Sequence, residues 1–355
     1  MSELFHSIQR NIKGPLVLPD GEMRFQTVDL HTCGEPLRVI LSGIPSLRGS
    51  TILQKRSEFS KNYDHIRRLL MYEPRGHADM YGCILVEPEH QTSDLGVIFM
   101  HNEGYSTMCG HATIALTKLV AKMQWAPIED GFMRLVLDVP CGEIRSTYDA
   151  SEANNEFGVS FEGVPSFVLS RDLVLELPGY PPVTFDIAYG GAFYAYVDAD
   201  LIGLPLDPSH VNEIIRLGRQ LKASIIRSHI QIEHPLSSDL SFLYGVIFRS
   251  KRTVSSAPYR NVCVFADGEV DRSPTGSGLC GFMALLHHKG LINNGDRIIV
   301  ESIIGSRFRA EIVKNVDLEG LPAVIPSIAG NAYIISSQNF ILQHDDPLRE
   351  GFILR

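Results

Sequence analysis

A cysteine placed just before an apolar helix is the first feature of this chain that could do chemistry. Cys109 precedes a run that is apolar on nearly every side, which is typical of a helix enclosed by other structure. Gly110 and His111 form its expected first turn, whose backbone N–H groups lack intrahelical partners and therefore bind anions. A helix N-terminus also lowers the pKa of a nearby thiol from its free value of roughly 8.5. The stretch predicts a cysteine nucleophile or base beside a carboxylate site, although most cysteines are small core residues.

A second stretch repeats this pattern with threonine in place of cysteine. Residues 275–277 (Thr-Gly-Ser) precede another apolar helix, about half a chain length after residues 109–111 (Cys-Gly-His). If the two halves are built alike, their helix N-termini face each other across a cleft, with Cys109 and Thr275 on either side. The residues expected to bind a small carboxylate are Gly110, His111, Gly276 and Ser277. The alternative interpretation is an ordinary flexible glycine–serine turn.

Two domains of α+β class must position these stretches. The chain has 355 residues, of which 44% are hydrophobic and 21% charged, so it is long enough for two cores. We predict a flexible lead-in at 1–22, a first domain at 23–150 and a second at 156–329, with part of 330–355 returning to the first. The polar segment 150–155 is the predicted linker.

The order of the expected elements favours largely antiparallel or mixed sheets, because strand follows strand too often for regular βαβ units. The first half is expected to contain strands at 24–30, 37–41, 80–87, 95–101, 133–139 and 143–148, with a helix from Ser57 to about Tyr72. The second half is expected to contain short strands between 157 and 197, a helix at 208–226, and strands at 242–248, 261–265, 297–304, 307–313 and 332–336. Each half therefore places short strands around one very apolar helix.

Charge and composition exclude several classes of function. The net charge of −9 disfavours nucleic acid or an anionic membrane as the main partner, so we expect a small-molecule substrate. Six cysteines occur without a CxxC pair, which is typical of reduced thiols in a cytoplasmic protein rather than of a zinc ribbon. The sequence has no signal-peptide core, no run of membrane-spanning length, no phosphate-binding glycine motif and no metal-ligand cluster.

Five segments in order along nearly the whole chain resemble the proline racemase family, which shares the diaminopimelate epimerase fold. They are residues 29–38, 73–82, 101–111, 186–195 and 271–278. The resemblance implies two similar domains with the active site in the cleft between them, a homodimer, and catalysis without pyridoxal phosphate or metal. It places Asp271 near the ring nitrogen of the substrate and implies that His111 hydrogen-bonds the substrate. It also includes His77 and Asp79, to which it assigns no role.

One departure from the family changes the expected chemistry. Racemases and epimerases of this family use two cysteines, one for each face of the α-carbon, whereas the second position here is Thr275. The alcohol has a far higher pKa than a thiol and is a poor second base. The Cys/Thr pair resembles the trans-3-hydroxy-L-proline dehydratase branch, which implies that Cys109 removes the α-proton and that water leaves to give Δ1-pyrroline-2-carboxylate. Cys33 is a smaller departure, at a position where the family usually has glycine.

Other functions remain open on the sequence. A hydroxyproline 2-epimerase or a proline racemase that works with one cysteine is the main alternative. A non-catalytic protein that kept the cleft is the other, and it predicts that replacement of Cys109 by serine changes no cellular function.

Overall fold

The computed structural model describes residues 23–354, so the expected flexible lead-in at 1–22 lies outside the described residues. In chain order, the elements of the first half are β1 (Met23–Thr32), β2 (Glu35–Ser42), α2 (Ile52–Asn62), α3 (Asp64–Met71), β3 (Tyr81–Val86), β4 (Leu95–His101), α4 (Gly110–Lys122), β5 (Phe132–Val139) and β6 (Gly142–Asp149). Along this order, antiparallel and parallel pairs of neighbouring strands alternate. The pairs β1–β2, β3–β4 and β5–β6 are antiparallel, whereas β2–β3 and β4–β5 are parallel. Each parallel pair requires a crossover, and the helices lie in these two crossovers.

The remaining elements are β7 (Val159–Glu162), β8 (Phe167–Leu175), β9 (Val183–Tyr189), β10 (Phe193–Asp198), η1 (Pro208–His210), α5 (Val211–Arg227), η2 (Ser238–Leu240), β11 (Leu243–Ser250), β12 (Tyr259–Phe265), β13 (Glu269–Val270), α6 (Gly276–His288), β14 (Arg297–Glu301), β15 (Arg307–Leu318), β16 (Leu321–Gly330) and β17 (Ala332–Leu342). Antiparallel and parallel pairs of strands alternate here as they do in the first half. The pairs β9–β10, β11–β12 and β14–β15 are antiparallel, whereas β10–β11 and β12–β14 are parallel. Helices α5 and α6 lie in the two crossovers, as α2–α3 and α4 do before.

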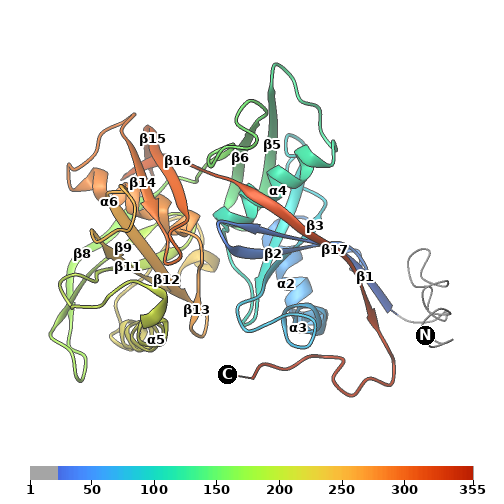
Figure 1. The fold of residues 1–355 in the computed structure, drawn as a ribbon, viewed down its shortest axis with the longest axis horizontal. Coiled ribbons are helices and arrows are strands. Elements are labelled where there is room, and N and C mark those ends of the chain that lie inside the picture. Colours follow the sequence, from blue (N-terminus) through green and yellow to red (C-terminus); the bar gives the residue numbers. More distant parts are fainter. Residues whose placement is uncertain (1–22, 355) are drawn as a thin grey trace, which may run out of the picture.

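The two halves form two lobes, each with one helix inside its strands (Figure 1). Twelve of the thirteen residues of α4 are buried, and so are eleven of the thirteen residues of α6. This burial explains why both helices are apolar on all sides. The predicted α+β class, with a mixed sheet around a central apolar helix in each half, is confirmed.

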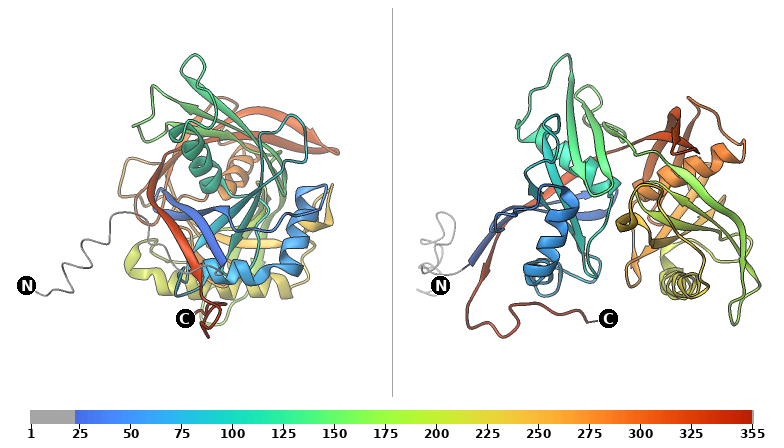
Figure 2. Two further views of the ribbon diagram at one scale, coloured as in Figure 1. Left: turned by 90° about the vertical axis from the view of Figure 1, so that its right-hand side faces the viewer. Right: turned by 180° about the vertical axis from the view of Figure 1, so that it is seen from behind.

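Three strands join the lobes. Strand β7 pairs with β6 on one side and with β16 on the other, so hydrogen bonding continues from the first half into the second. Strand β17 then runs back to the first lobe and pairs along the whole of β1 (Figure 2). The domain boundaries given above stay a prediction.

One local expectation is wrong and one strand is missing from the prediction. The helix expected from Ser57 to Tyr72 begins earlier, at Ile52, because Thr51 and Gln54 form a capping box there, and it is interrupted at Tyr63 before α3 begins. The strand β16 is absent from the predicted elements, and it contains Pro326, which has no backbone donor. The structure accommodates it opposite Ile312, next to a register shift in β15.

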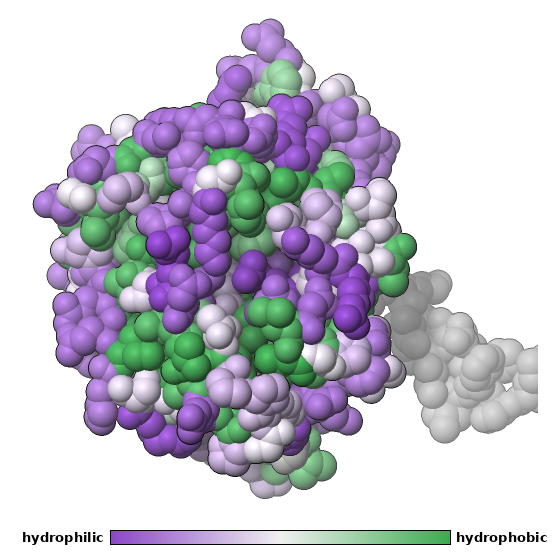
Figure 3. All heavy atoms as spheres, turned by 90° about the vertical axis from the view of Figure 1, so that its left-hand side faces the viewer, coloured by the Kyte–Doolittle hydropathy of each residue, from purple (hydrophilic) through white to green (hydrophobic). Residues whose placement is uncertain are grey.

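The surface of the second lobe is mixed in polarity. Figure 3 shows hydrophilic residues interspersed with hydrophobic ones on its outer face. Apolar atoms normally contribute more than half of a protein surface, so this distribution needs no special partner. No helix of the described residues is long and apolar enough to cross a membrane.

Candidate active site

The N-termini of α4 and α6 meet directly. A Cβ atom built on Gly110 would lie 2.6 Å from the Cα atom of Gly276, so neither glycine has room for a side chain. Cys109 and Thr275 are the N-cap residues of the two helices. The backbone N–H groups of both first turns therefore point toward one place, as the apparent repeat in the sequence predicts.

All seven residues expected in the site line one pocket at this junction. They are Cys109, Gly110, His111, Asp271, Thr275, Gly276 and Ser277. The space at the pocket is about 290 Å³, part of which is open to solvent. The sequence did not identify the residues that complete its walls, which are Tyr81, Met108, Tyr194, Tyr244, Cys263 and Phe265. The aromatic residues lie in strands, where the alternation of apolar and polar residues predicts only that these side chains are buried in the core.

Cys109 is buried in the wall formed by the first lobe. Its Sγ atom accepts a hydrogen bond from the backbone N–H of Ala112 at 3.4 Å and lies 3.1 Å from Nδ1 of His111. Burial raises the pKa of the thiol well above its usual value, and the N–H of Ala112 and the hydroxyl of Tyr81 only partly oppose this rise. The sequence-based expectation of a lowered pKa is therefore corrected, because desolvation outweighs the helix N-terminus.

His111 is a neutral ring beside this thiol. Burial lowers the pKa of His111 to about 3, so the imidazole carries no charge near neutral pH. Its orientation is fixed by the chain around it. The Thr32 hydroxyl donates a hydrogen bond to the backbone carbonyl of His111 at 2.8 Å, and the ring packs edge-on against Tyr81 with centroids 4.8 Å apart. A neutral imidazole in this position can exchange a proton with the sulfur or with a bound molecule.

The second lobe forms the opposite wall with Thr275, Ser277 and Asp271. Thr275 has a φ of 66°, and its Oγ1 atom is buried without a hydrogen-bond partner among the described residues. The Ser277 hydroxyl lies 2.7 Å from the hydroxyl of Tyr194. Asp271 accepts a hydrogen bond from the backbone N–H of Ser273 at 2.7 Å, and burial raises its pKa to about 6. This wall presents hydroxyl groups and one carboxyl group to the pocket.

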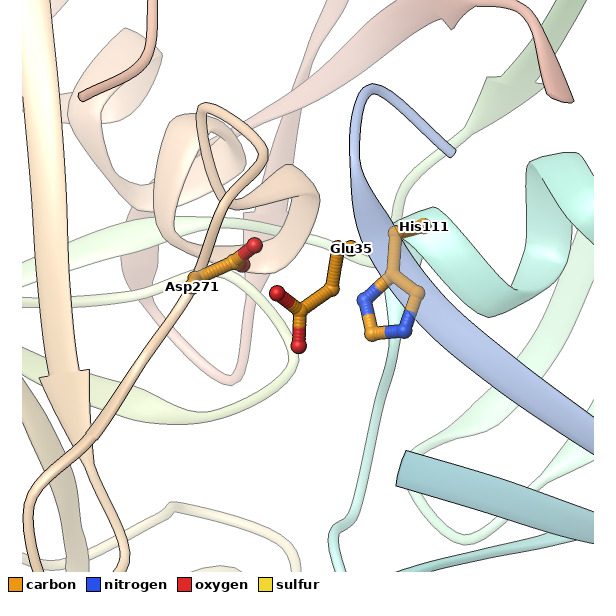
Figure 4. A group of neighbouring side chains, drawn as sticks. All are labelled: Glu35, His111 and Asp271. Atoms are coloured by element: carbon orange, nitrogen blue, oxygen red, sulfur yellow. The ribbon is translucent and has the colours of Figure 1, made fainter. Parts of the chain in front are cut away.

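Glu35 is a further buried carboxyl group at the site, and the sequence analysis did not single it out. It lies between Asp271 and His111 (Figure 4), and the three residues each bring one polar atom within 4.8 Å of the others. Its Oε2 atom accepts a hydrogen bond from the backbone N–H of Arg272 at 2.7 Å. Carboxylate and imidazole groups can hold a metal ion, and we assign none to this group. Its position within the matched segment 29–38 was the only available signal.

His77 and Asp79 lie at the junction between the lobes and do not line the pocket. Asp79 forms an ion pair with Arg272 at 2.8 Å, and its backbone N–H donates a hydrogen bond to Nδ1 of His77 at 3.2 Å. Cys33 also lies at this junction and has a φ of 54°, the left-handed conformation that glycine adopts most easily. Ser306 donates a hydrogen bond to its carbonyl oxygen at 2.9 Å. These residues make contacts between the two lobes and do not form part of the substrate site.

Comparison with known proteins gives consistent similarities over the whole length. The family model described as proline racemase matches residues 27–353. The chain is 46% identical over 343 residues to a trans-3-hydroxy-L-proline dehydratase of Colwellia psychrerythraea, with 96% of each chain covered. It is 43% identical to a 3-hydroxyproline 2-epimerase of Burkholderia multivorans, which covers 93% of this chain and 98% of the relative. A crystal structure of a hydroxyproline epimerase from Agrobacterium vitis with bound trans-4-OH-L-proline is 28% identical with a TM-score of 0.86, covering 94% of this chain and 96% of that chain.

Proposed function

The chain belongs to the proline racemase family, and on that premise we propose that it is a trans-3-hydroxy-L-proline dehydratase. The observation that carries the proposal is the pairing of one thiol with one alcohol, Cys109 and Thr275, in the same pocket. Two acid–base groups are needed to exchange a proton between the two faces of an α-carbon, whereas elimination of water needs one base at that carbon. This site offers one such base in the position that the family uses.

The substrate binds through its two charges. The carboxylate lies against the first-turn N–H groups of the two helices, contributed by Gly110, His111, Gly276 and Ser277. The ring ammonium faces Asp271, whose carboxylate is the acidic group in the pocket wall. Burial raises the pKa of the Cys109 thiol and so disfavours the thiolate. The positive charge of the bound ammonium group opposes this effect and stabilises the thiolate.

The reaction removes one proton and one hydroxide. The Cys109 thiolate takes the proton from C2, the electrons of the C2–H bond form the C2=C3 double bond, and the C3–O bond breaks. In trans-3-hydroxy-L-proline the C2 hydrogen and the hydroxyl group lie on the same ring face, so a concerted elimination is syn. The leaving hydroxide takes a proton on this face, where the Cys109 thiol and the adjacent His111 ring lie. The products are water and an enamine, which tautomerises to Δ1-pyrroline-2-carboxylate.

The helix N-termini lower the barrier electrostatically. Removal of the α-proton shifts negative charge toward the substrate carboxylate, and preorganised N–H donors stabilise charge that develops there. Thr275, on the opposite wall, donates a hydrogen bond to the substrate but does not exchange a carbon-bound proton, since its alcohol is a weak acid.

The decisive experiment compares elimination with epimerisation. Purified protein is incubated with trans-3-hydroxy-L-proline in D2O, and the products are followed by NMR. We expect the pyrroline product to accumulate without the 2-epimer of the substrate. Formation of the 2-epimer, or of D-proline from L-proline, without a pyrroline product would overturn the proposal.

A 3-hydroxyproline 2-epimerase is the second candidate. The 43% identical relative of that name supports it, and so does Cys263, a second thiol in the pocket wall that carries Thr275. Burial raises the pKa of both thiols, but Cys109 is the N-cap of α4, whereas Cys263 lies inside strand β12, where no first-turn N–H groups stabilise a thiolate. We therefore keep the dehydratase as the main proposal. We also propose a cytoplasmic homodimer, which sedimentation and cell fractionation test.

A further inference from the structure

The pair of buried carboxyl groups formed by Glu35 and Asp271 goes beyond the proposed function. Asp271 lines the pocket, and Glu35 lies beside Asp271 but is not among the residues that line it. Both side chains are almost completely buried, at 1% and 5% exposure. Their oxygen atoms lie within 4.8 Å of each other. Burial and the repulsion between two negative charges at this distance both favour a pair in which one carboxyl group keeps its proton.

The hydrogen bonds indicate which carboxyl group keeps the proton. Asp271 accepts from the backbone N–H of Ser273, and Glu35 Oε2 accepts from the backbone N–H of Arg272. Glu35 Oε1, in contrast, is buried without a partner among the described residues. An unpaired buried acceptor is costly, and a proton on this oxygen converts it into a donor. We propose that Glu35 is a positioning residue that works as a neutral carboxylic acid, so that the pair presents one negative charge, that of Asp271, to the substrate nitrogen.

The surroundings of Glu35 support this assignment. The groups that face it are Asp271, Arg272 and Glu269 from the segment before α6, and the neutral ring of His111 from α4. Burial raises the pKa of Glu35 well above its usual value, and the charges of Asp271 and Glu269 add to the rise. The Arg272 guanidinium opposes it, but that group is paired with Asp79.

The proton on Glu35 has a consequence for the reaction. A second negative charge near Cys109 would make its thiolate harder to form, and the proton on Glu35 removes that charge. The kinetic test of this inference rests on the proposed function, whereas the protonation state of Glu35 does not depend on it.

Substitutions at Glu35 distinguish a side chain that acts in its protonated, neutral form from one that acts as a carboxylate. Glu35→Gln keeps the shape and a donor, so we expect kcat/KM at neutral pH to stay within about threefold of the unsubstituted protein. Glu35→Ala leaves the buried backbone N–H of Arg272, next to Asp271, without its acceptor, and we expect a loss of at least about tenfold. At alkaline pH the unsubstituted protein should lose activity as Glu35 ionises, whereas Glu35→Gln should not. Glu176→Gln, at an exposed glutamate, is the matched control.

Three results would overturn the proposal. One is a loss in Glu35→Gln as large as in Glu35→Ala, which indicates an ionised Glu35, including one that binds a metal ion. Another is unchanged activity and pH profile in Glu35→Ala. The third comes from infrared difference spectra of the unsubstituted protein minus Glu35→Gln. At neutral pH we expect the C=O band of a protonated carboxylic acid, and a carboxylate band alone contradicts the proposal.

The spectrum keeps this test independent of the proposed function. If the protein does not dehydrate trans-3-hydroxy-L-proline, the proposed function fails while the infrared band still decides the state of Glu35. Binding of pyrrole-2-carboxylate, a planar mimic of the deprotonated ring, then replaces kcat/KM as the second readout. Its affinity should be retained in Glu35→Gln and lowered by at least about tenfold in Glu35→Ala.

Discussion

Gly110 and Gly276 stand face to face, and a Cβ atom built on either glycine would lie within 2.7 Å of the Cα atom of the other. This contact sets the distance between the two helix N-termini. It also sets the distance between the N–H groups proposed to hold the substrate carboxylate and between the walls that carry Cys109 and Thr275.

An alanine at either glycine should therefore push the helix N-termini apart. We expect Gly110→Ala and Gly276→Ala to lower kcat/KM by more than about tenfold and the free energy of unfolding by about 1–3 kcal/mol, as overpacking does. Denaturant unfolding and steady-state kinetics measure the two effects. Gly104→Ala is the control, because a Cβ atom there meets nothing within 4 Å. Equal activity in Gly110→Ala and Gly104→Ala would contradict the proposed carboxylate site.

Replacement of Cys109 by serine should abolish turnover while leaving binding intact. Acid–base catalysis by a placed group contributes about 10²–10⁴-fold, so we expect a loss of at least about 100-fold in kcat. Calorimetry should still detect pyrrole-2-carboxylate, since the helix N–H groups are unchanged. Cys141→Ser, at a partly exposed cysteine outside the pocket, is the control. Substantial dehydration by Cys109→Ser would assign the base to another residue.

Thr275→Cys should add a second thiol to the wall opposite Cys109. We expect this variant to incorporate deuterium from D2O at C2 and to form the 2-epimer of its substrate, which the unsubstituted protein does not. Chiral chromatography and NMR detect both products. Thr275→Ser is the matched control, and it should form no epimer. Absence of exchange in a folded Thr275→Cys protein would mean that residue 275 does not face C2.

The ionisation of Asp271 should limit activity at acid pH. Burial raises its pKa to about 6, and the proposed ammonium contact needs the carboxylate, so kcat/KM should fall as the pH drops through about 6. Because this pKa is higher in the folded than in the unfolded chain, protonation of Asp271 itself stabilises the fold. Circular dichroism should therefore stay native where activity is lost. Asp271→Asn should be inactive at every pH, and a rate independent of pH from 5 to 8 would contradict the assignment.

Much of this architecture can be predicted from the sequence, because it depends on local patterns. The two apolar helices and the residues at their N-termini follow from periodicity and from glycine next to a small polar residue. Thr51, by contrast, caps α2 six residues before the expected Ser57, because two residues can each serve as a cap and only the capping box with Gln54 decides between them. The strand containing Pro326 pairs with the preceding strand β15 and also with β7, which lies far earlier in the chain, and no local pattern shows this second pairing.

The sequence predicts which residues form the site better than it predicts their pKa values. The helix N-terminus suggests a lowered thiol pKa at Cys109, yet the burial that opposes it depends on how closely the two lobes approach. Glu35 shows the same limitation. Its partners Asp271 and Arg272 are more than two hundred residues away along the chain, so only the folded structure shows that the carboxyl groups share one site.

The return of β17 to pair with β1 has a consequence for synthesis of the protein. Of the described strands, β1 is the first to be synthesised and β17 the last, so one edge of β1 stays open until residues 332–342 have been made. An unpaired strand edge is a template for aggregation. A chain truncated before residue 332 leaves this edge open permanently. Nascent chains of this protein should therefore need protection, such as binding by a chaperone, until the final strand is released.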